Sequence, residues 1–199
     1  AHGNYKINWH YQPIKGKTAP SDLEWHKIPD FGFFGDIKLI WEPSRFSNTV
    51  HFILAYNETR ELKYARNCIE LMTDWIDSNQ FPYGVNYKCG QEISFRLYAW
   101  ITALDFFSGV LTDQEKEKIT GNIYTSLLRI DSNISYAVKS VRNNHSISEA
   151  AGLFAGGLLF PDFPESQKWL KKGMKLLLQE TGYQISDDGS YIQHSMNYH

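Results

Sequence analysis

Two asparagines and a histidine stand directly before a run of small apolar residues, in the stretch VRNNHSISEAAGLFAGGLL at residues 141–159. If a helix begins near Ser146, Asn144 and His145 lie at its N-terminal edge, where unpaired backbone N–H groups and the positive end of the helix dipole are found. An amide and an imidazole N–H would add two donors there, so the pattern suits the binding of a carboxylate or a phosphate. Glu149, four residues after His145 on the same helix face, can orient the imidazole or merely support the helix. The simpler interpretation is that Asn144 only caps the helix, and spacing alone favours it, since asparagine is a common N-cap residue.

A second group that could transfer protons lies in the stretch YIQHSMNYH at residues 191–199. Here Tyr198 directly precedes His199, and His194 stands four residues earlier. A tyrosine hydroxyl beside imidazoles can transfer a proton if nearby donors lower its pKa. Most such tyrosines and histidines are structural, so the pattern nominates Tyr198 without assigning it a reaction.

A third polar group lies in GVNYKCGQEISFRLYAW, at residues 84–100, where Glu92 and Arg96 are four residues apart. An exposed ion pair at this spacing is the simple interpretation, and it contributes only about 0.2–0.5 kcal/mol. The functional alternative is a buried pair beside a carbohydrate groove, with Asn86 on the preceding loop. The aromatic content of 15% suits either sugar stacking or an ordinary core.

Composition and motifs exclude several classes of protein. Twenty basic against twenty-two acidic residues give a net charge of −2, which argues against a nucleic-acid partner. The longest apolar run covers only residues 150–160, which is too short for a membrane span. The two cysteines, Cys68 and Cys89, form no CxxC motif and are expected to be unpaired thiols. The sequence contains no HExxH, phosphate-loop, dinucleotide-binding or GxSxG motif.

The elements that must position these groups are mostly helical. The first forty residues mix Pro, Gly, Trp and Tyr without periodicity and are expected to form an aromatic-rich arm. After them, apolar residues recur at helical spacing in residues 44–57, 61–78, 93–104, 112–127, 134–141 and 147–158, and a last helix begins at Pro164 and Glu165. Thr112 and Glu115 form a capping box, and residues 183–195 are expected to be extended or turn-like. Consecutive helices with short connections pack antiparallel, so the sequence predicts an all-α fold of helical hairpins around a common axis or in a layer.

Five stretches together resemble the heparinase II/III-like polysaccharide lyases, in order and approximate spacing, across nearly the whole chain. They are GDIKLIWEPSRF, LAYNETRELKYA, DWIDSNQFPYGVNYKCGQEISFRLYAW, NNHSISEAAGLFAGGLLFPDFPESQKWLKKG and DDGSYIQHSMNYH. The NNH, EAAGL and FPDFPE motifs and the final YH are the most specific. The resemblance implies an incomplete (α/α) toroid followed by a C-terminal antiparallel β-sandwich domain. On this basis residues 1–40 are the arm and residues 41–199 are part of the toroid, truncated before the sandwich.

The resemblance also implies a reaction: cleavage of uronic-acid-containing polysaccharides by β-elimination. Asn144, with His145 beside it, would neutralise the uronate carboxylate, in the manner of an oxyanion hole. Tyr198 would act as the acid/base that protonates the leaving glycosidic oxygen. Residues nominated for the substrate groove are Asn86, Glu92, Arg96, Arg142 and His199. The family takes a further His or Tyr, and often a divalent metal, from the later part of the chain. No cofactor is therefore expected in this segment, and the segment alone is expected to be inactive.

The expected partners are an acidic polysaccharide and the C-terminal domain of the same polypeptide, in a periplasmic or secreted bacterial protein. Two other functions stay open. An (α/α)-toroid glycoside hydrolase would need two carboxylates facing one sugar, and the spacing singles out no such pair. A non-catalytic glycan-binding or scaffold toroid would bind without turnover.

Overall fold

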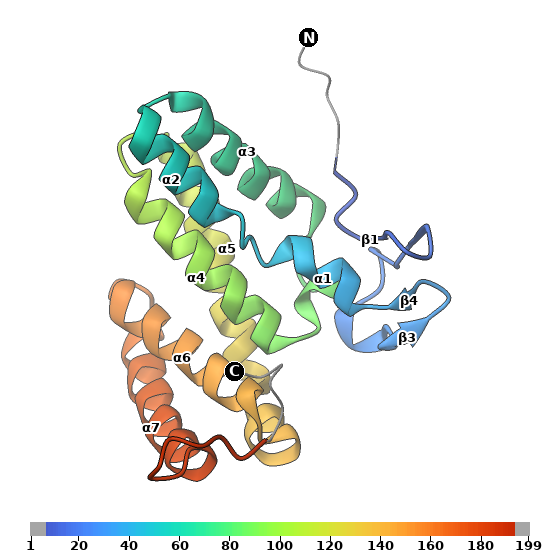
Figure 1. Ribbon diagram of the computed structural model, residues 1–199, viewed down its shortest axis with the longest axis vertical. Helices are drawn as coiled ribbons and strands as arrows, with labels where there is room; N and C mark the ends of the chain where they lie inside the picture. The colour runs from blue at the N-terminus through green and yellow to red at the C-terminus, as the bar shows by residue number, and fades with distance from the viewer. Residues whose placement is uncertain (1–6, 194–199) are drawn as a thin grey trace. The chain divides into compact units, whose positions relative to one another are not determined.

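The computed structural model describes residues 7–193 (Figure 1). The chain divides into two compact units, with the boundary between Thr125 and Ser126, inside the long helix α5 (Asp113–Tyr136). Outside the N-terminal arm the described residues are predominantly helical, which confirms the predicted all-α class. Among these residues, no helix is long and apolar enough to cross a membrane.

The N-terminal arm of unit 1 consists of two small hairpins and a 3₁₀ turn. Their bounds are β1 (Tyr11–Gln12), β2 (Lys17–Thr18), η1 (Trp25–Lys27), β3 (Phe31–Gly32) and β4 (Gly35–Asp36). β1 pairs antiparallel with β2, and β3 with β4. Ile28 and Phe34 bury their side chains in one cluster with Ile40 and Val85 from the helical part of the unit. This shared cluster packs the irregular arm against the helices.

The helices of unit 1 are α1 (Lys38–Ser44), α2 (Thr49–Thr59), α3 (Leu62–Ser78), the 3₁₀ turn η2 (Val85–Tyr87) and α4 (Gly90–Phe106). The predicted helix over residues 44–57 is wrong in its first turn, because the chain breaks at Phe46. That residue has a φ of 57°, and its buried ring stacks on Trp9 and meets the edge of Trp100. Aromatic packing thus holds Phe46 in a left-handed conformation that local periodicity does not indicate.

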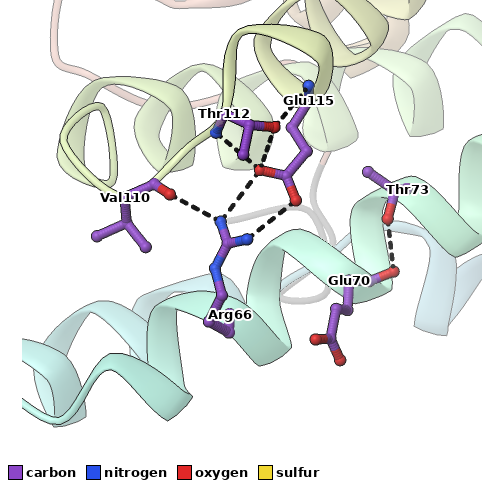
Figure 2. A network of polar contacts seen from close by, with 6 residues as sticks. All are labelled: Arg66, Glu70, Thr73, Val110, Thr112 and Glu115. Atoms are coloured by element: carbon purple, nitrogen blue, oxygen red, sulfur yellow. Dashed lines mark hydrogen bonds and ion pairs between the residues drawn. The ribbon is translucent and has the colours of Figure 1, made fainter.

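The predicted capping box is confirmed and belongs to a larger network (Figure 2). Glu115 accepts the backbone N–H of Thr112 at 2.8 Å, and its own N–H donates to the Thr112 hydroxyl at 3.3 Å. Arg66 of α3 donates to both carboxylate oxygens of Glu115 and to the carbonyl of Val110. One arginine therefore ties α3 to the start of α5.

Unit 2 contains the rest of α5, a π-helical turn η3 (Ala137–Val141), α6 (Asn144–Leu159) and α7 (Ser166–Gln184). The separate helix predicted for residues 134–141 is wrong, because α5 continues to Tyr136 and passes directly into η3. Helices α6 and α7 form an antiparallel hairpin (Figure 1).

Small residues let the two helices of this hairpin approach each other closely. A methyl group at Gly157 would meet the backbone of Leu170 at 2.4 Å, and one at Gly173 would meet that of Phe154 at 2.4 Å. The glycine-rich pattern in α6 therefore serves tight helix packing.

Candidate anion site at the start of helix α6

The first turn of α6 is capped by Asn143. Its side chain accepts the backbone N–H of His145 at 3.0 Å, and its backbone is extended. The helix starts at Asn144, two residues before the predicted start at Ser146. The simpler interpretation of Asn144 as the N-cap is therefore wrong. The cap geometry assigns that task to the preceding residue, because only there does the backbone leave the helical region while the side-chain oxygen reaches an N–H.

The side chain of Asn144 thereby remains available to a ligand. Its Oδ1 is buried, and no hydrogen-bond partner for it exists among the described residues. A buried amide oxygen without a partner costs about 1–3 kcal/mol, so this acceptor calls for an explanation. Because an amide oxygen only accepts hydrogen bonds, an anion at the positive end of α6 would be contacted by the Nδ2–H₂ group of Asn144, which is a donor.

A cation stands at the turn before this helix. Arg142 follows η3 with a left-handed φ of 42°, and its N–H donates to the carbonyl of Ala137 at 2.7 Å. π-helical turns of this kind are frequent at functional sites. The guanidinium lies over the ring of Tyr183 at 3.5 Å, and its Nε is 3.8 Å from Oε2 of Glu180. The Arg142 side chain is 43% exposed, so it can contact a ligand as well.

Beneath the turn lies a buried polar network between α6 and α7. The hydroxyl of Ser146 donates to Oε2 of Glu180 at 3.0 Å and lies 2.8 Å from the carbonyl of Asn143. Gln184 donates to the Ser146 hydroxyl at 2.8 Å and to Oε2 of Glu180 at 3.2 Å. Its own oxygen accepts the hydroxyl of Tyr191 at 2.9 Å. The first turn of α6 is therefore anchored to the last turn of α7.

Glu149 is a second buried carboxyl of unit 2, one turn after His145. It is 3% exposed, and its Oε2 has no hydrogen-bond partner among the described residues. Burial raises the pKa of Glu149 to about 7, although the positive charge of Arg129 opposes this rise. The carboxyl is therefore partly protonated at neutral pH.

The three site candidates in unit 1 lie in its core. Asn86 is 1% exposed and donates to Oδ1 of Asn79 at 2.8 Å. Arg96 is also 1% exposed, lies over the ring of Trp75 at 4.0 Å and donates to the carbonyl of Asn86 at 3.2 Å. Burial lowers the pKa of Arg96 to about 10. The structure thus brings Asn86 and Arg96 together, in contacts that hold the loop before α4.

Glu92 is buried, as the functional alternative expected, but the predicted pairing with Arg96 is wrong. Both oxygens of Glu92 accept hydrogen bonds from Arg45, which also pairs with Glu42. Helical spacing could not reveal this partner, since Arg45 lies forty-seven residues away. That Asn86, Glu92 and Arg96 line a substrate groove stays a prediction.

The remaining candidates, Tyr198 and His199, lie outside the described residues, as does His194. Within residues 7–193, no three His, Cys, Asp or Glu side chains gather as a metal site. The sequence reasoning assigned no role to Asn143 and missed Glu180 and Gln184. A polar pair at a four-residue spacing on the buried side of α7 was the available signal for the last two.

Comparison with known proteins agrees with this fold. The model of the heparinase II/III N-terminus matches residues 2–199. A heparin-sulfate lyase of Bacteroides thetaiotaomicron is 28% identical over 73% of this chain and 21% of its own length. A heparin-sulfate lyase of Bacteroides stercoris is 23% identical over 100% of this chain and 31% of its own length. This chain therefore spans between a fifth and a third of those relatives.

Among solved structures, the heparan sulfate lyase HepC of Pedobacter heparinus superposes with a TM-score of 0.64 and 22% identity. The match covers 77% of this chain and 24% of that one. At this identity the likeness concerns the fold, and it confirms the predicted helical portion of an (α/α) toroid. With the family model matching almost every residue, the chain belongs to the heparinase II/III family, as part of its N-terminal region.

Proposed function

We propose that the polypeptide carrying this chain is a polysaccharide lyase that cleaves uronic-acid-containing glycosaminoglycans by β-elimination. The observation that supports this most directly is the division of labour between Asn143 and Asn144. The first caps α6, so the side chain of the second does not serve as the cap, and its Nδ2–H₂ group is the donor that we assign to the uronate carboxylate at the positive end of the helix. The names of the relatives, heparin-sulfate lyases, fit the same class of substrate.

The chemistry requires an anion site of this kind. Removal of the proton at C5 of a uronate sends its electron pair towards the adjacent carboxylate, which must then bear additional negative charge. Donors that contact the carboxylate lower this barrier, and removal of one such donor typically costs about 10²–10³ in rate. We assign this task to Asn144, with His145 beside it and the dipole of α6 behind both.

The elimination then completes without water. The electron pair from the C5–H bond forms the C4–C5 double bond, the bond from C4 to the glycosidic oxygen breaks, and that oxygen receives a proton. In this proposal a further His or Tyr from the later part of the polypeptide accepts the C5 proton as general base, and Tyr198 supplies the proton to the glycosidic oxygen as general acid. The products are an unsaturated uronate and a chain with a new hydroxyl end.

Arg142 extends the site by one positive charge. It is half exposed at the turn before Asn143, so its guanidinium can contact a carboxylate or sulfate of the polysaccharide. A charged polysaccharide is not expected to cross a membrane unaided. We therefore further propose a periplasmic or secreted location in a bacterium.

The test is an absorbance assay of the full-length protein against heparan sulfate, hyaluronan, chondroitin, alginate and bacterial surface polysaccharides. Elimination creates a double bond conjugated with the carboxylate, which absorbs in the ultraviolet, whereas hydrolysis creates none. New reducing ends without absorbance would instead identify a glycoside hydrolase, and binding without either product would identify a scaffold.

Tyr198→Phe in the full-length protein should abolish turnover and preserve substrate binding. Tyr136→Phe is the matched control, because Tyr136 is 60% exposed and lies outside the proposed site. Normal turnover by the Tyr198 variant would contradict the assignment of the acid.

A further inference from the structure

Glu180 is a carboxyl with 0% exposure in the middle of the network beneath the α6 turn. Its Oε2 accepts the Ser146 hydroxyl at 3.0 Å and the Gln184 amide at 3.2 Å, and Oε1 accepts the Gln179 amide at 3.3 Å. Arg142 adds a positive charge at 3.8 Å from Oε2. Enclosing a carboxylate costs several kcal/mol unless its oxygens are paired, and here both are paired.

These contacts join three segments of unit 2. Arg142 belongs to the turn that follows η3, and Ser146 belongs to the first turn of α6, directly after Asn144 and His145. Gln184 also links Glu180 to Tyr191, because the hydroxyl of Tyr191 donates to the side-chain oxygen of Gln184.

Tyr191 lies in a small turn-like segment that directly follows α7 and is held to its end by two further contacts. The segment closes through a bridge between Ile185 and Tyr191, and the N–H of Ile192 donates to the carbonyl of Gln184 at 2.8 Å. Tyr198 follows Tyr191 by seven positions in the sequence. The network therefore contacts both the first turn of α6, where the proposed anion site lies, and the turn-like segment that precedes Tyr198 in the sequence.

We propose that Glu180 is a positioning residue of the proposed lyase site, which sets the start of α6 and residues 185–193 in one arrangement. This inference rests on the proposed function. Glu180 contacts no substrate atom in this proposal; it acts through Ser146 on Asn144 and His145, and through Gln184 and Tyr191 on the segment leading to Tyr198. A wholly packing role would not need a carboxylate, because an apolar side chain of similar size fills the same volume without a desolvation cost.

The test compares Glu180→Gln, Tyr191→Phe and the double variant in the full-length protein, with Asp162→Asn as a charge-matched control on the surface of unit 2. Kinetics on heparan sulfate are measured well below each variant's melting temperature, so that the folded fraction is complete. Glu180→Gln should lower kcat by about tenfold or more, because small displacements of catalytic groups are costly. KM should change by less than about threefold, since the substrate contacts remain.

The double variant should be no slower than Glu180→Gln alone, because both substitutions interrupt one chain of contacts. Equal kcat values for Glu180→Gln and the wild type, or independent losses that multiply in the double variant, would overturn the inference. If Glu180→Gln does not fold, Tyr191→Phe decides alone, since it removes a single hydroxyl: an unchanged kcat then counts against the proposal.

Amide hydrogen exchange separates this inference from the proposed function. Glu180→Gln should accelerate exchange in residues 142–149 and in residues 185–193 together, whereas Tyr191→Phe should accelerate only the second segment. A wild-type protein that gives no ultraviolet product refutes the lyase and with it the expected effect of Glu180 on turnover. Unchanged exchange in an active Glu180 variant refutes the positioning role alone.

Discussion

Asn143 accepts the backbone N–H of His145 at 3.0 Å and so closes the first turn of α6. This contact shows which asparagine of the NNH motif caps the helix. The cap is supplied by the first asparagine, and the second enters the helix with Oδ1 buried and unpaired. Substitution of the first asparagine is therefore expected to lower stability, and substitution of the second to lower activity.

Asn143→Ala should destabilise the protein, whereas Asn144→Ala should inactivate it. Loss of an asparagine N-cap lowers the free energy of unfolding by about 1 kcal/mol. Asn144→Ala removes the buried unpaired oxygen together with the proposed donor, so it should leave the free energy of unfolding unchanged or slightly raised and should lower kcat by about 10²–10³. Urea denaturation and the ultraviolet assay measure the two effects. Equal stability losses in the two variants would contradict the division of labour.

Glu149 should make the stability of the protein fall as pH rises through the weakly acidic range. Its folded pKa of about 7 lies above the usual 4.5, so the folded state holds a proton that the unfolded state has already lost. Between these two values stability decreases with increasing pH, and above the folded pKa the loss is complete. The difference between the folded and unfolded pKa values of Glu149 corresponds to about 3 kcal/mol of stability that is lost between low and high pH.

Glu149→Gln should remove this dependence, because the amide does not titrate and keeps the shape of the protonated carboxyl. Relative to the wild type, the variant should therefore gain stability at pH 8 compared with pH 4, as measured by denaturant unfolding at both values. Asp162→Asn, an exposed substitution in the same unit, is the control and should show no such change. A wild-type slope that persists in Glu149→Gln would show that another group is responsible.

Gly173→Ala and Gly182→Ala, both in α7, should shift stability in opposite directions. Alanine is the better helix former, so at Gly182, where nothing lies within 4 Å of an added methyl group, stability should rise by about 0.5–1 kcal/mol. At Gly173 the added methyl would stand 2.4 Å from the backbone nitrogen of Phe154, and overpacking of this kind costs about 1–3 kcal/mol. Thermal unfolding of the two variants measures both effects. Stabilisation by Gly173→Ala would mean that α6 and α7 separate readily.

The sequence by itself determined the helices with a strong apolar periodicity and the contacts between residues close together in the chain. Ala65, Ile69 and Met72 recur at helical spacing, and all three are buried in α3. The capping box of Thr112 and Glu115 formed as predicted, since it depends only on residues three apart. The motifs around NNH also indicated the family, because they preserve residue types and order along the chain.

Only the tertiary structure decided which polar groups meet. The partner of Glu92 is Arg45 rather than Arg96, and the partner of Ser146 is Glu180, thirty-four residues away. The break at Phe46 likewise depends on aromatic rings from distant segments. Helical periodicity reports which face of a helix is buried, but the pairing of buried charges depends on how the helices pack. That packing brings Glu180 and Ser146 into contact beneath the start of α6.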